Sequence, residues 1–175
     1  NLESIQRKYN FNGKYFHLPN QIWAHKNHLV VLQAVNRLKR SGVDVQVLCT
    51  GNTKDYRVTG AEYIDQLREF IEANDLQHNI RILGLIDYGD VLFLMRNAVA
   101  VINPSRFEGW SSSVEEAKSM GIPVVLSNIG VHIEQDPANA HYFYPNDFLG
   151  LAEILRAVWN KSDTQSQIKF EKAAA

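Results

Sequence analysis

The sequence predicts an α/β domain in which helices cover both faces of a doubly wound, parallel sheet of about five or six strands. Short apolar runs alternate with longer segments of helical periodicity along almost the whole chain. The runs are apolar at most positions, which is typical of strands buried on both faces. With 175 residues, 45% of them hydrophobic and 21% charged, the chain suits one domain with a substantial core.

Five short apolar runs are the predicted strands. They are rich in Val, Ile, Leu and aromatic residues, and polar or glycine-containing segments separate them. The runs cover residues 15–19, 43–49, 79–84, 98–104 and 122–127, and a sixth, shorter apolar run covers 142–145.

Helices are predicted between these runs, where apolar residues recur at three- and four-residue spacing. Ile64, Leu67 and Ile71 show this pattern, and Gly42 and Gly121 follow two such segments as stop signals. The predicted helices cover residues 27–42, 61–75, 88–98, 113–121 and 147–161.

Charge and cysteine content exclude several classes of protein. The formal net charge is −1, and no basic stripe indicates nucleic acid or an anionic membrane as a partner. The single cysteine, Cys49, lies in an apolar run, so we expect a reduced core residue rather than a disulfide framework. There is no signal peptide and no apolar span of membrane length. These features favour a cytoplasmic protein.

The ends of the chain suggest a fragment of a longer protein. It begins at Asn1 rather than at an initiator Met. We assign residues 1–163 to the domain and residues 164–175 to a tail, either a frayed helix or an appended end.

In a doubly wound sheet, ligands bind outside the carboxyl ends of the strands, on the loops that lead into helices. Functional residues are therefore expected on five loops, which cover residues 19–28, 50–60, 84–90, 103–113 and 127–134.

Two glutamates, Glu108 and Glu116, lie seven residues apart around one of these loops. A capping box, formed by Ser113 with Glu116 or by Ser112 with Glu115, would explain an acid in the first turn of the following helix. It would not explain Glu108, which precedes the helix. A carboxylate beside unpaired helix-start amides makes a pocket that can bind hydroxyls and an anion together. Both interpretations remain open.

The segment "SRFEGWSSSVEEAKSMGIPVVLSNIG" resembles the E-G-x-G-x-x-x-x-E-A-x-x-x-G-x-P-V-V region of retaining glycosyltransferases of family 4. The resemblance extends from "YFHLPNQIWAHKNH" to the helix near residue 160 and includes "NIRILG". These enzymes have the GT-B architecture, two Rossmann-like domains that face a cleft. The chain resembles the C-terminal, nucleotide-sugar-binding domain, which implies an absent N-terminal acceptor domain.

The resemblance implies roles for the acidic segment. Glu108 would contact the donor sugar at the reaction centre, and Glu116 would bind the ribose hydroxyls. Gly109, Trp110 and Ser111 would offer backbone N–H groups to the diphosphate. The family usually has a second glycine where this chain has Ser111, and a Cβ there would hinder close approach to a phosphate.

It also implies roles on the other loops. Lys26 matches a lysine that stabilises the diphosphate in the family, although the residue type alone is also typical of a solvated helix start. Gln21 stands where the family has an arginine, and a protonated His25 or His28 would partly replace that charge. Three residues would border the nucleotide, unless the two glycines serve only as turn residues: Gly51, Gly84 and Leu85.

The sequence therefore predicts the donor-binding half of a glycosyltransferase that moves a sugar from a nucleotide diphosphate sugar to an acceptor hydroxyl with retention. The resemblance implies a metal-independent class, in keeping with the absence of an Asp-x-Asp motif, and no residues have metal-ligand spacing, so no cofactor and no metal are expected. Any membrane contact is expected through the missing domain. The alternatives are a non-catalytic nucleotide-sugar binding module and an oxidoreductase, although the G-x-G-x-x-G expected of the latter is absent after the first strand.

Overall fold

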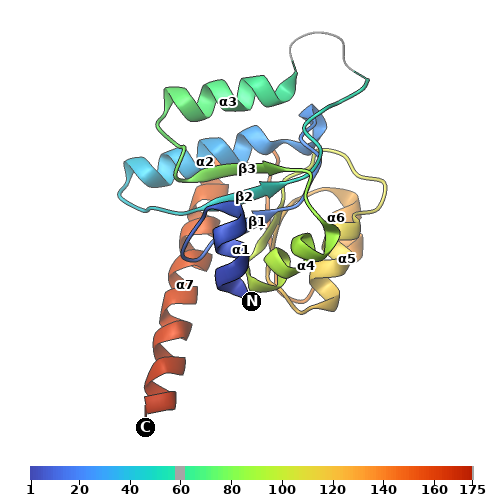
Figure 1. Ribbon diagram of the computed structural model, residues 1–175. Helices are drawn as coiled ribbons and strands as arrows, with labels where there is room; N and C mark the ends of the chain where they lie inside the picture. The colour runs from blue at the N-terminus through green and yellow to red at the C-terminus, as the bar shows by residue number, and fades with distance from the viewer. Residues whose placement is uncertain (58–61, 175) are drawn as a thin grey trace.

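The structure of the chain, a computed structural model, describes residues 1–57 and 62–174 (Figure 1). Some predictions fall partly on other residues. The end of the loop expected at 50–60, the first residue of the helix expected at 61–75 and the last residue of the tail lie outside the described residues.

The six described strands form one parallel sheet in the order β3-β2-β1-β4-β5-β6, which confirms the predicted fold class. This Rossmann-like order reverses between β1 and β4, the topological switch point where such sheets bind ligands. The strands are β1 (Phe16–Leu18), β2 (Val47–Thr50), β3 (Ile80–Gly84), β4 (Val101–Asn103), β5 (Val124–Ser127) and β6 (Ala140–Phe143).

Helices cover both faces of the sheet (Figure 1). One face is covered by α2 (His28–Arg40), α3 (Tyr63–Ala73) and α7 (Phe148–Ala174). The other is covered by α1 (Leu2–Tyr9), α4 (Tyr88–Asn97) and α5 (Ser112–Ser119), with α6 (Gly130–Gln135) packed beside α5. A short 3₁₀ helix, η1 (Ala24–Lys26), precedes α2.

Alternate strand residues supply the two layers of the core. Phe16 and Leu18 of β1 pack with α2 and α7, whereas Leu48 of β2 packs with α4 on the opposite face. Cys49 is 1% exposed within the first layer, so the predicted core position of this cysteine is confirmed.

Several element boundaries differ from the predicted ones. The strand expected from residue 43 begins only at Val47, because the carbonyl of Val45 accepts a hydrogen bond from the Asn79 side chain (2.9 Å) rather than from a neighbouring strand. The polar helix α1 was not predicted, and α6 occupies most of a segment expected to be a loop. Helix α7 runs through residue 163 without a break, so the domain boundary there stays a prediction.

Candidate functional site

A pocket of about 350 Å³ lies at the carboxyl ends of the strands, where the loops after β1, β2, β3 and β4 converge. Most of the sequence-predicted site residues line it: Gln21, Lys26, Gly51, Leu85, Glu108, Trp110 and Ser111. Gly84, Gly109 and Glu116 are not among its lining residues. The structure thus brings together residues from four separate segments at the switch point of the sheet.

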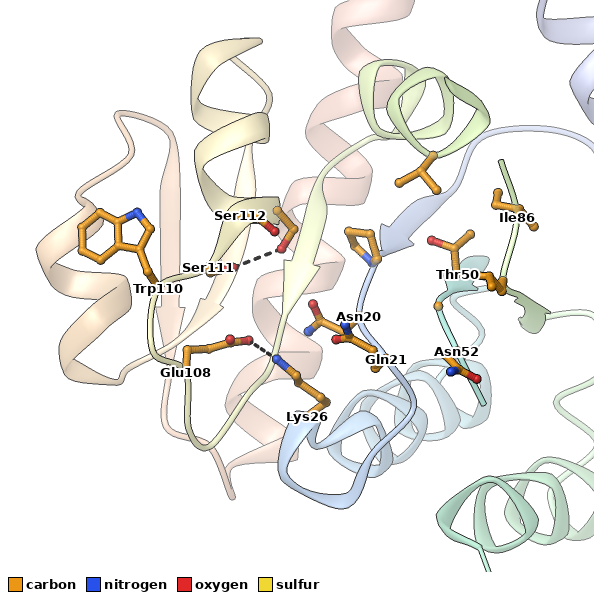
Figure 2. A pocket seen from close by; sticks show the side chains of 15 residues that line it. Asn20, Gln21, Lys26, Thr50, Asn52, Ile86, Glu108, Trp110, Ser111 and Ser112 are labelled. Atoms are coloured by element: carbon orange, nitrogen blue, oxygen red, sulfur yellow. Dashed lines mark hydrogen bonds and ion pairs between the residues drawn. The ribbon is translucent and has the colours of Figure 1, made fainter. Parts of the chain in front are cut away.

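Lys26 and Glu108 form an ion pair on the wall of this pocket. The Lys26 Nζ lies 2.8 Å from the Glu108 Oε1, and the two side chains are only 11% and 9% exposed. Figure 2 shows them pointing toward one another, whereas the indole of Trp110 turns away. Lys26 is therefore not a solvated lysine at a helix start. Its charge is held inside the pocket by a partner that belongs to the same site.

The loop before α2 is bent so that Lys26 points inward. Asn27 adopts a left-handed conformation (φ 62°), which ends η1 and starts α2. Its buried side chain donates to the carbonyl oxygens of Pro104 (3.0 Å) and Pro145 (2.8 Å). The first bond joins the loop after β1 to the loop after β4, which carries Glu108, and the second joins it to the loop after β6.

Three donors converge on the Oε1 atom of Glu108. Besides Lys26, they are the Ser105 hydroxyl at 2.7 Å and the Asn103 amide at 3.4 Å. Burial raises the pKa of Glu108, but the bonds from Lys26 and Ser105 outweigh it and hold the pKa below its ordinary value. The second oxygen, Oε2, has no bonding partner in the described part of the chain. A charged carboxylate with one free oxygen is well suited to accept a hydrogen bond from a hydroxyl.

Two buried asparagines lie at the strand ends, of which Asn20 lines the pocket and Asn103 lies behind it. Asn20 donates to the Oδ1 of Asn103 at 2.9 Å, directly across the switch point. Asn103 in turn donates to the Ser111 hydroxyl at 2.9 Å. Neither asparagine was predicted from the sequence, and Ser105 was not predicted either. The asparagines could have been recognised as amide side chains at the ends of apolar strands, because a polar group buried there needs a hydrogen-bond partner.

The start of α5 offers a set of unbonded amides. Ser111 is the N-cap, and its hydroxyl accepts from the Val114 amide at 3.4 Å. Among the described residues, the amides of 109–113 have no acceptor. Such a row of N–H groups at a helix start favours an anion.

The predicted capping boxes are wrong, because the helix is capped by Ser111, one residue before Ser112 and two before Ser113. With Ser111 at the N-cap, the third helical position is Val114, which has no carboxylate to bond back to the cap. Glu115 instead accepts from the Gln135 side chain at 3.0 Å. The Ser111 side chain is buried among polar partners, so it does not stand in the pocket as a free hydroxyl.

Glu116 lies outside the pocket lining, one turn into α5. Its Oε1 accepts a hydrogen bond from the hydroxyl of Tyr88, a residue that is 61% exposed at the start of α4. The carboxylate is half-buried and has no role in capping. It is therefore oriented by a neighbouring helix, with its other oxygen left for a further partner.

The turn after β2 requires a glycine for structural reasons. Gly51 has φ 139°, and a Cβ there would lie 2.3 Å from the Asn20 carbonyl oxygen. Its amide donates to the carbonyl of Gly84 at 2.8 Å, so it is not available to a ligand. Leu85 follows as an apolar side chain that is 80% exposed on the pocket wall.

Neither His25 nor His28 is placed to replace the charge of the missing arginine. Gln21 is exposed on the pocket wall as expected. His28 is fully buried, and burial lowers its pKa to about 3. Burial, followed by the charges of Lys26 and Arg57, also lowers the pKa of His25. Both rings are therefore neutral at pH 7, and the expectation that one of them supplies the charge is wrong.

Two further properties concern only the residues that the structure describes. No helix is both long and apolar enough to cross a membrane. No group of three or more His, Cys, Asp or Glu side chains is placed to hold a metal ion.

Two solved structures share this fold. A glycosyltransferase from Rickettsia africae superposes with a TM-score of 0.77 at 22% identity, over 91% of this chain and 41% of that one. The HepE protein of Anabaena, solved in complex with UDP and glucose, superposes with a TM-score of 0.76 at 16% identity. That match covers 93% of this chain and 43% of HepE.

Two curated relatives are similar in sequence over shorter lengths. Glycogen synthase of Mycobacterium tuberculosis is 29% identical over 131 residues, which cover 73% of this chain and 29% of that protein. An O-antigen chain mannosyltransferase of Escherichia coli is 35% identical over 65 residues, or 37% of this chain and 17% of that protein. The matched part of the chain thus spans less than a third of either relative.

The family described as glycosyl transferases group 1 matches residues 3–172, almost the whole chain. This match excludes the oxidoreductase alternative. The chain belongs to the group 1 glycosyl transferases, and its domain has the fold of one half of a GT-B enzyme.

Proposed function

We propose that this chain is the donor-binding half of a retaining glycosyltransferase, which transfers a sugar from a nucleoside diphosphate to an acceptor hydroxyl. One observation carries the proposal. A cation, a carboxylate with a free oxygen and a row of unbonded amides meet in one pocket at the switch point of the sheet. The family match and the UDP and glucose bound to HepE support the same class of donor.

The diphosphate would lie against the start of α5. The amides of 109–113 would bind its oxygens, and Lys26 would balance the charge that grows on the leaving diphosphate as the glycosidic bond breaks. Lys26 is already fixed near this position by its pairing with Glu108, so little reorganisation is needed before the reaction. Gln21 would donate a hydrogen bond without charge.

The sugar and the nucleoside would lie on either side of the diphosphate. The free Oε2 of Glu108 would accept from a sugar hydroxyl or face the positive charge that develops on the sugar ring. Glu116 would accept from the ribose hydroxyls, with Tyr88 holding its other oxygen. Leu85 and the backbone at Gly84 would contact the base, which needs an apolar surface and a peptide group.

The acceptor would be bound mainly by a second domain that this chain does not contain. We propose that the complete enzyme closes the two domains over the donor, and that transfer needs no divalent metal. The metal proposal predicts equal turnover with and without EDTA.

The test is sugar transfer by the full-length protein, with product masses measured for donors that include UDP-glucose and GDP-mannose. Glu108→Gln is expected to reduce turnover by about a hundredfold, the cost of one well-placed electrostatic group. Its affinity for UDP or GDP should scarcely change, because these ligands lack the sugar. Wild-type turnover in this variant would refute the role of Glu108.

A non-catalytic nucleotide-sugar binding module is the second candidate, and one observation favours it. Lys26 is the one formally charged cation among the pocket-lining residues that the structure describes, and Glu108 already neutralises it. Such a module would bind a nucleotide sugar without releasing the nucleotide. Binding without any product from the full-length protein, over the whole donor panel, would favour this candidate over the enzyme.

A further inference from the structure

We propose that Ser105 is the positioning residue of Glu108. Its hydroxyl holds the Oε1 atom so that Oε2 stays directed at the donor sugar, including when the Lys26 ammonium group also binds the diphosphate. The inference rests on the proposed function, because it assigns a role within the same pocket. Neither the sequence motif nor the family match assigns a role to this serine.

The geometry distinguishes Ser105 from the other two donors to Glu108. The Ser105 Oγ lies 2.7 Å from the carboxylate oxygen, whereas the Asn103 amide is at 3.4 Å, the limit of a hydrogen bond. Lys26 is close, but a bound diphosphate would compete for its ammonium group. The Ser105 bond is therefore the short contact that a bound donor leaves in place.

The backbone of Ser105 is held firmly enough to act in this way. Its amide donates to the Asn103 Oδ1 at 3.2 Å, and its carbonyl accepts from the Ser127 hydroxyl at 2.5 Å. Ser127 is in turn contacted by the His132 ring, whose Nδ1 lies 2.9 Å from the Ser127 carbonyl oxygen. Ser105, Ser127 and His132 are all fully buried. A buried serine bonded on both sides of its backbone has little freedom to follow a displaced carboxylate.

A hydrogen bond from this hydroxyl matters to chemistry only if it orients a charge that acts in the transition state. Without it, Glu108 would keep its ion pair but could rotate about its side-chain torsions toward Lys26. The transition state would then lose electrostatic stabilisation, while the nucleotide contacts on α5 would stay unchanged. The expected signature is a lower kcat at nearly constant affinity for the nucleoside diphosphate.

The experiment compares Ser105→Ala, Ser105→Cys and Glu108→Gln in the full-length protein, with UDP-glucose and GDP-mannose as donors. Ser105→Ala is expected to lower kcat by about ten- to thirtyfold, a typical loss for one hydrogen bond to a charged group. The dissociation constant for UDP or GDP should change less than about twofold, because the bond does not touch the nucleotide. Ser105→Cys, which keeps a weaker donor on a slightly larger side chain, should fall between Ala and the wild type.

Ser166→Ala on the exposed part of α7 is the matched control and should keep wild-type kcat. Thermal unfolding checks that both Ser105 variants fold. If the alanine variant does not fold, the cysteine variant is compared with the wild type instead.

Each outcome decides between the two proposals. Wild-type kcat in Ser105→Ala together with a large loss in Glu108→Gln would overturn the role of Ser105 and leave the proposed function intact. Equal losses of kcat and of nucleotide affinity in both Ser105 variants would show a structural serine and also overturn the inference. If Glu108→Gln itself keeps wild-type turnover, the proposed function fails, and the positioning role fails with it.

Discussion

Lys26 and Glu108 are nearly buried and form an ion pair, so each charge has the other as its direct partner. When one member of a buried ion pair is removed, the remaining charge is left without a partner in a site that water barely reaches. At this position the pair also belongs to the proposed reaction centre. Its stability effect can be measured separately from catalysis, since unfolding needs no ligand.

We expect Lys26→Met to reduce the free energy of unfolding by about 3 kcal/mol, because Glu108 would lose its counter-ion. Glu108→Gln should be destabilising for the converse reason. The double variant should cost less than the two single changes together, with a coupling of about 2 kcal/mol. Urea unfolding of the four proteins gives the cycle. Additive single costs would contradict a coupled pair.

Tyr88 is expected to set the orientation of Glu116. Tyr88→Phe removes the hydroxyl that bonds to the Glu116 carboxylate and leaves the ring in place. If Glu116 binds ribose, the binding free energy for UDP should weaken by about 1 kcal/mol, the typical net contribution of one hydrogen bond. Calorimetry with UDP measures the change. The control is Tyr144→Phe, which removes a hydroxyl from a residue that is 69% exposed and does not line the pocket.

A pair of results would contradict the Tyr88 assignment. If Tyr88→Phe and Tyr144→Phe bind UDP equally well, the bond between Tyr88 and Glu116 is a surface contact without consequence for the nucleotide.

The sequence was sufficient to predict site residues that lie on the loops after the strands. Glu108 and Lys26 were predicted on separate loops, and the structure brings them to 2.8 Å. Asn103 and Ser105 were missed, because a single amide or hydroxyl beside an apolar strand has no distinctive spacing. Their role depends on which loop packs against them, and that is decided by contacts between residues far apart in the chain.

The turn after β2 needs a glycine because a side chain there would clash with the neighbouring loop. The Asn20 carbonyl passes where a Cβ would stand, and the backbone has a positive φ of 139°. Gly51→Ala is expected to lower the free energy of unfolding by roughly 2–4 kcal/mol through strain and displacement of the neighbouring loop. Gly89→Ala is the control, because a Cβ there meets nothing within 4 Å and a helix prefers alanine. Similar stabilities of the two variants in urea would contradict the close approach at Gly51.

Helix α2 begins with a buried histidine that should make the fold sensitive to acid. Both ring nitrogens of His28 lack a bonding partner among the described residues, and burial lowers its pKa to about 3. The unfolded chain binds a proton at this residue below about pH 6.5, whereas the folded chain does not. The stabilising contribution is therefore complete above pH 6.5 and is lost as the pH falls toward 3.

His28→Leu removes the side chain that binds this proton when the protein unfolds, so the stability should depend less on pH. The slope of the unfolding free energy between about pH 6 and pH 4 should decrease by about 1.4 kcal/mol per pH unit, with little change at pH 7. Urea unfolding at several pH values measures the slope. An unchanged slope would mean that the ring is solvated or charged in the folded protein.

Element types were easier to predict than element ends. The β-branched run before Thr50 predicts a strand from residue 43, yet the pairing starts at Val47 because Asn79 bonds to the preceding backbone. Helix α1 is short and mostly polar, and only Leu2, Ile5 and Tyr9 mark its apolar face. The late start of β2 depends on a specific side-chain bond, which periodicity does not describe.

For the whole molecule, the alternation of strands and helices was enough to predict a doubly wound sheet, but not its strand order. The order β3-β2-β1-β4-β5-β6 places the loops after β1 and β4 side by side at the switch point. That neighbourhood creates the contact between Lys26 and Glu108 and the bond between Asn20 and Asn103. A sequence pattern alone does not specify which strands are neighbours, so the pocket could be predicted only as a group of candidate loops.

The last prediction concerns what this chain can do without a second domain. The solved structures that it matches are more than twice as long, and we have proposed that this chain binds the donor while a second domain binds the acceptor. A reaction between two bound substrates gains much of its rate from holding both in place and from excluding water, and one half of the cleft can do neither completely. The 175-residue chain is therefore expected to bind UDP or GDP within about tenfold of the full-length affinity.

It should nevertheless release almost no nucleotide from UDP-glucose or GDP-mannose when an acceptor is added. Calorimetry and a nucleotide-release assay on the same preparation measure both properties, and Lys26→Met serves as a variant with weakened binding of the diphosphate. Turnover by the isolated chain at the full-length rate would show that the acceptor binds to this domain. Loss of nucleotide binding in the isolated chain, with its fold intact by circular dichroism, would show instead that the second domain contributes to the donor pocket itself.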